Sequence, residues 1–75
     1  MNNKRRAKAS EAIQSLEIVL SLIESLIDAE QSALEGIPEN MNTRVERCED
    51  TLSDLEDAKA SVEDAIEKLE SATDR

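Results

Sequence analysis

Apolar residues recur along the chain at alternating spacings of three and four, in two blocks separated by a short polar stretch. This spacing is a heptad repeat, which is typical of a helix that packs along its length against another helix. The pattern predicts an all-α fold. We call these repeating positions the seam. In the first block the seam consists of Ala9, Ile13, Leu16, Leu20, Ile23, Ile27, Glu30 and Leu34. In the second block it consists of Val45, Cys48, Leu52, Leu55, Lys59, Val62, Ile66, Leu69 and Thr73.

The only helix-stop signal lies between the two blocks, at residues 36–42. Gly36 suits the left-handed residue just past a helix end, with a positive φ, and Pro38 cannot continue a helix. The next helix is expected to start at a capping box formed by Thr43 and Glu46, with Asn42 as the competing cap. The pattern therefore predicts one domain over residues 1–75, with helices at about 4–35 and 43–73 and a turn at 36–42. Because the connection is short, the helices should form an antiparallel, coiled-coil-like hairpin.

The first helix carries more apolar residues than one partner helix can cover. Val19 and Leu26 are expected to flank its seam on one side, with Ile18, Leu22 and Ala29 on the other. In the second helix Thr51, Ala58, Ala65 and Ala72 form a stripe of small residues beside the seam. Exposed apolar stripes normally mark an interface. We therefore expect a homodimer or higher homo-oligomer, most simply a four-helix bundle, whose interface contains Ile18, Val19, Leu22, Leu26, Ala29, Ala58 and Ala65.

Chain size supports the same expectation. The chain has 75 residues, one Cys, no His and no aromatic residue, so it has neither disulfides nor a zinc-ligand set to stabilise a small core. The lone Cys48 fits a reducing cytoplasm, and no secretory signal follows the basic start. The most apolar window, residues 16–27, contains Glu17 and Glu24 and is too short to span a membrane. A cytoplasmic location is expected.

Charge is distributed unevenly. The formal net charge is −9, yet residues 1–10 carry +4, which leaves −13 on the remainder. An acidic body repels phosphates, so nucleic acid is a disfavoured partner. The basic arm, Lys4, Arg5, Arg6 and Lys8, has two interpretations. It could meet the acidic end of the second helix at Glu67, Glu70 and Asp74, which we favour, or it could bind an external anion. The candidate anion-binding residues are Lys4, Arg5, Arg6, Lys8, Arg44 and Arg47.

The sequence contains few residues that could support catalysis. There is no His base or Gly-rich phosphate loop, and Cys48 falls on the apolar seam, where a small buried side chain is the favoured interpretation. The acidic pairs that recur every seven residues in the second helix are interpreted as a solvated face rather than a metal site. Glu30 and Lys59 interrupt the two seams and should lie too far apart to pair within one chain. We expect no enzyme activity, no cofactor and no metal.

Some local segments resemble a known group. These are the basic start Met1–Arg6, the acidic stretch Asp28–Gln31, the turn Ile37–Met41, the pair Glu46-Arg47 and blocks such as Leu55–Ala58. With these features the chain resembles small helical-hairpin proteins of bacteriophages and prophages of gut bacteria, especially Firmicutes. The resemblance implies an origin in a mobile element and implies no particular activity.

The expected function is therefore that of a non-enzymatic interaction protein, an oligomeric hairpin that binds a host or phage protein. The alternative is a counter-defence inhibitor. Such an inhibitor would act either as an acidic decoy of nucleic acid or as an oligomeric sponge for a signalling nucleotide. A decoy would use the acidic side of the second helix, whereas a sponge would use the basic arm.

Overall fold

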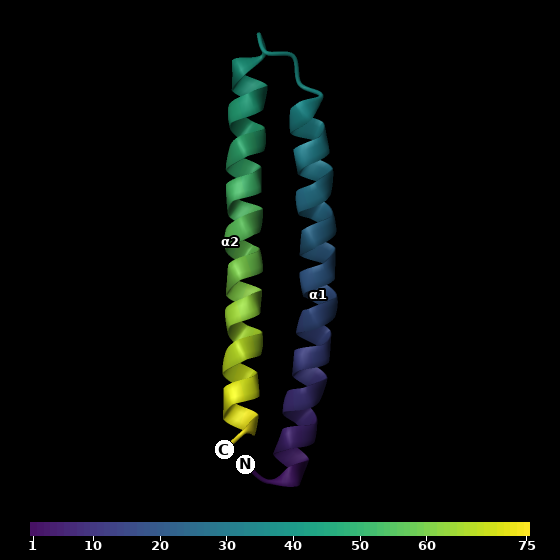
Figure 1. Cartoon of the computed structure of the whole chain (residues 1–75), viewed down its shortest axis with the longest axis vertical. Coiled ribbons are helices and arrows are strands. Elements are labelled where there is room, and N and C mark those ends of the chain that lie inside the picture. Colours follow the sequence, from purple (N-terminus) through teal and green to yellow (C-terminus); the bar gives the residue numbers. More distant parts are fainter.

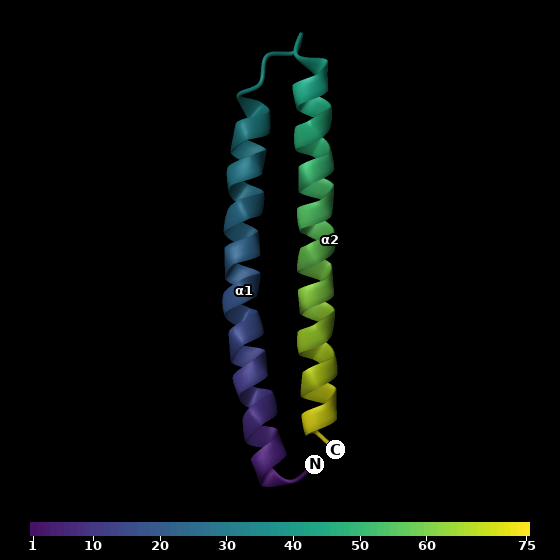
Figure 2. The ribbon, with the colours of Figure 1, turned by 180° about the vertical axis from the view of Figure 1, so that it is seen from behind.

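The computed structural model describes residues 1–75 as two α-helices joined by a turn, with α1 at Asn3–Glu35 and α2 at Asn42–Thr73. The helices run antiparallel, so both chain termini lie at one end and the turn at the other (Figure 1). They lie side by side over their whole length (Figure 2). The molecule is 58 Å long and only 15 Å by 11 Å across. The expected all-α hairpin is confirmed.

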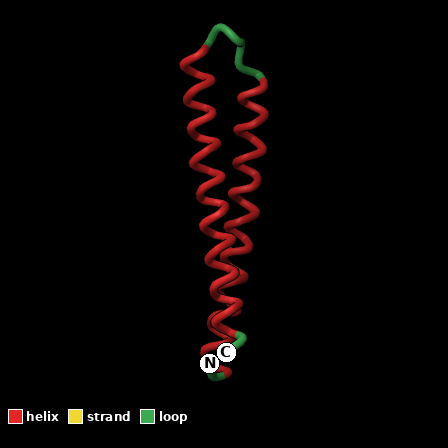
Figure 3. Tube along the Cα trace, turned by 60° about the vertical axis from the view of Figure 1, so that its left-hand side comes forward, coloured by secondary structure: helices red, strands yellow, loops and turns green.

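The two helices wind gently about each other. When the molecule is turned by 60°, they are separate near the turn and overlap toward the termini (Figure 3). This winding follows from the heptad spacing, because a strict seven-residue repeat keeps one stripe of a helix facing its partner only if the helices supercoil. The periodicity of the sequence thus accounts for the overall shape.

The predicted seams are confirmed position by position. In α1 every seam residue is buried or half-buried, and every other residue is exposed. In α2 the seam residues are likewise buried or half-buried, and the only additions are Ala58, Ala65 and Ala72. Burial is shallow throughout, since only Ala9, Ile27 and Cys48 are classed as buried and no side chain is fully enclosed. Two helices alone therefore provide a thin core.

The turn differs from the prediction at Gly36. Its φ is −85° and its ψ −7°, a right-handed conformation, so the expected positive φ is wrong. Its N–H donates to the carbonyls of Ser32 and Ala33 at 3.3 and 3.2 Å, which continues the last turn of α1. The six residues between the helices give the chain enough length to reverse without a left-handed residue. A Cβ at Gly36 would meet Ala33 O at 3.6 Å, which is ordinary contact.

The predicted capping box of α2 is also wrong. The helix begins at Asn42, and the cap residue is Met41, which makes no side-chain capping hydrogen bond. Its carbonyl accepts from Val45 N–H at 3.1 Å. Thr43 therefore lies inside the first turn, where its backbone is helical and its hydroxyl is not placed to cap. The cap that the sequence reasoning missed is Asn2, whose side-chain oxygen accepts from Arg5 N–H at 2.9 Å.

Candidate functional site

Large apolar side chains are exposed along the middle of α1. The exposed fractions are 65% for Ile18, 61% for Leu22, 53% for Leu26 and 41% for Val19. The other exposed large apolar residues are Met1 and Met41, which lie outside both helices. Isolated exposed apolar side chains are ordinary, but four within nine residues of one helix form a contiguous apolar patch.

These four side chains lie on one continuous arc of α1. Leu22 follows Val19 by three residues and Ile18 by four, and Leu26 follows Leu22 by four, so each is a neighbour of the next on the helix surface. The expectation that Ile18, Leu22 and Ala29 lie on the other side of the seam from Val19 and Leu26 is therefore wrong. At about 100° per residue, Leu22 lies beyond Val19 on the same side, and Ile18 lies beyond Leu22.

The small-residue stripe of α2 extends this patch. Val19 and Leu26 immediately precede seam residues, as do Ala58 and Ala65 in the other helix. When two antiparallel helices turn their seams toward each other, the positions that precede the seam fall on the same broad face of the hairpin. Ala58 and Ala65 are half-buried there. We call the combined surface the apolar face; it consists of Ile18, Val19, Leu22, Leu26, Ala29, Ala58 and Ala65.

The opposite broad face is acidic. It is built from the residues that immediately follow seam positions, and all of them are exposed. We call it the acidic face; it consists of Glu17, Glu24, Glu49, Glu56, Glu63 and Glu70. The hairpin therefore carries its apolar patch on one side of a thin rod and a row of carboxylates on the other.

Cys48 lies between the helices near the turn, as the seam predicted. Its Sγ donates to Glu30 O at 3.4 Å and to Glu30 Oε2 at 3.3 Å. Burial raises the pKa of the thiol, and the hydrogen bond to Glu30 together with the charges of Glu30 and Glu49 raises it further. A reactive thiol needs a lowered pKa and a nearby base, so this environment favours a structural side chain. The contact also gives the register of the hairpin, because it places Glu30 opposite Cys48.

The candidate anion-binding residues separate into two groups. Lys4, Arg5, Arg6 and Lys8 lie in the first turns of α1, whereas Arg44 and Arg47 lie in the first turns of α2, at the opposite end of the 58 Å rod. They cannot form one site within one chain. The side-chain hydrogen bonds of the molecule include none from the basic arm to Glu67, Glu70 or Asp74.

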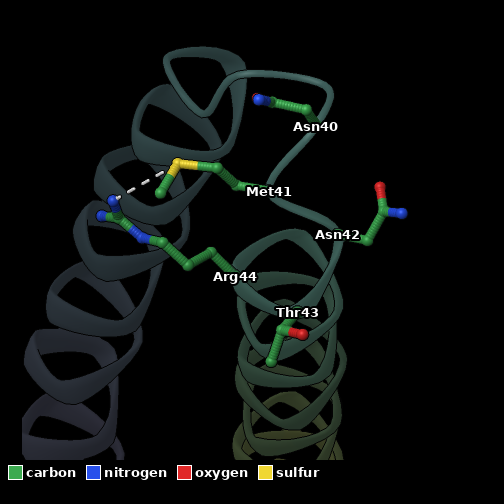
Figure 4. A pocket seen from close by; sticks show the side chains of 5 residues that line it. All are labelled: Asn40, Met41, Asn42, Thr43 and Arg44. Atoms are coloured by element: carbon green, nitrogen blue, oxygen red, sulfur yellow. Dashed lines mark hydrogen bonds between the residues drawn. The ribbon is translucent and has the colours of Figure 1, made fainter.

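A hollow at the turn is lined by five exposed residues, Asn40, Met41, Asn42, Thr43 and Arg44 (Figure 4). Arg44 Nη1 lies 4.0 Å from Met41 Sδ, so the guanidinium rests against the thioether. No buried polar group lines this hollow, and the Asn42 amide points away from the side chains of Met41 and Arg44 (Figure 4). It therefore lacks the convergent polar groups of a ligand site.

Two further properties of the molecule bear on function. No group of three or more Asp, Glu or Cys side chains is arranged to hold a metal ion. Neither helix has a stretch of the length and apolarity needed to cross a membrane. Comparison of the chain with protein families, curated proteins and solved structures gives no match.

Proposed function

We propose that this chain is a non-enzymatic interaction protein that self-associates through the apolar face into a four-helix bundle and binds a host or phage protein through its hydrated surfaces. One observation carries the proposal: α1 exposes four large apolar side chains on one arc, while α2 exposes none within its helix. An exposed apolar patch of this kind marks an interaction surface.

The energetics support self-association. The hairpin has only three buried residues, so its own core is thin. Full burial of one Leu, Ile or Val side chain contributes about 1.5–3 kcal/mol. Covering the four exposed side chains of α1 would therefore add a contribution comparable to the ~3–5 kcal/mol that a core of this size usually supplies. The small side chains of Ala58 and Ala65 let a second hairpin approach closely.

The acidic face would remain outside such a bundle. Repulsion between carboxylates opposes contact of two acidic faces, so this side is left for water or for a different molecule. A partner protein with a basic patch fits its charge. Catalysis has no support among the side chains described above, since the pKa of the one thiol is raised and the carboxylate of Glu30 beside it raises that pKa further.

Sedimentation equilibrium tests the proposal. The wild-type chain at low micromolar concentration should have at least twice the mass of the monomer. The double variant Ile18→Glu/Leu22→Glu should sediment as a monomer, because each carboxylate would have to be buried without a partner. A matched control is Gln14→Glu/Ser21→Glu, which places two carboxylates on the polar side of the same helix.

The control should keep the wild-type mass. A wild-type chain that is a compact monomer at high micromolar concentration would contradict the proposal. So would a control variant that dissociates as completely as Ile18→Glu/Leu22→Glu, because net charge and not the apolar face would then govern the mass.

A further inference from the structure

We draw no further inference here: the strongest candidate, the apolar face that runs along the middle of the hairpin, carries nothing beyond the function proposed above, because nothing in the structure shows what covers it.

Discussion

The two helices differ by one residue in length and present the same seam to each other, yet their outer surfaces have little in common. Outside its seam α1 exposes Ile18, Val19, Leu22 and Leu26, whereas α2 exposes no large apolar residue and half of its exposed residues are carboxylates. Formation of a hairpin requires only the seam. It therefore explains why the two seams are alike, but not why the outer surfaces of the two helices differ. The difference therefore needs an explanation outside the hairpin, and in the proposed bundle α1 is the helix that meets the second copy.

The largest predicted effect tests whether the seam, rather than the exposed apolar arc of α1, stabilises the hairpin. We call that exposed arc the outer arc. In an Ile18→Glu background, which keeps the chain dissociated, Ile27→Ala should lower the free energy of unfolding by about 2–4 kcal/mol, because Ile27 is one of three buried residues. Leu22→Ala in the same background should change it by less than about 0.5 kcal/mol. Urea unfolding followed by circular dichroism measures both. Equal losses would mean that the outer arc contributes to the hairpin itself.

A smaller effect concerns the two helix starts. Asn2 caps α1 through its side chain, whereas Met41 provides no side-chain cap for α2. Asn2→Ala should therefore destabilise the hairpin by about 1 kcal/mol, and Met41→Asp should stabilise it by up to about 1 kcal/mol. The midpoint of urea unfolding measures both changes. The comparison fails if Met41→Asp lowers the midpoint, since α2 would then be capped in solution by another group.

The smallest predicted effect is the pH dependence contributed by Cys48. The pKa of its thiol is raised in the folded chain, so the folded state holds the proton more tightly than the unfolded state. This contribution is fully present below the ordinary thiol pKa and is lost as pH rises through the range above it. The melting temperature should fall between about pH 8 and pH 10, and it should fall less in Cys48→Ala.

Glu30→Gln provides the matched control for that measurement. It keeps a hydrogen-bond acceptor near Sγ but removes one of the charges that raise the pKa of the thiol. The decline should therefore start at the same pH as in the wild type, because the pKa of the unfolded thiol is unchanged, but it should end at a lower pH and be smaller in total. An identical pH profile in wild type and Cys48→Ala would contradict the predicted contribution of Cys48.

The seam could be predicted from the sequence because burial in a two-helix hairpin repeats with the period of the helix, and seventeen positions share one rule. The ends of the helices could not be predicted in this way, because a helix that starts one or two residues earlier or later is capped by a different side chain. Thr43 and Glu46 matched a capping box, but α2 begins at Asn42. Likewise, a glycine at position 36 can adopt a left-handed conformation but does not have to.

The apolar residues of this face were identified from the sequence, but their positions around the helix were not predicted correctly. Its residues stand out by type, because Ile18 and Leu22 are apolar where a solvated helix carries polar groups. Their common arc also follows from the spacing, since Leu22 is three residues after Val19 and four before Leu26. The contact of Cys48 with Glu30 depends on the register between the helices, which the length of the turn determined only to within about a residue.

The antiparallel register has a consequence for how the chain folds. Partners near the turn are close in sequence, as Glu30 and Cys48 are at 18 residues apart, whereas partners at the termini are separated by nearly the whole chain. Loop closure is entropically cheaper for short separations, so pairing should start at the turn and proceed toward the termini like a zipper. The terminal end would then be the last to close and the first to fray.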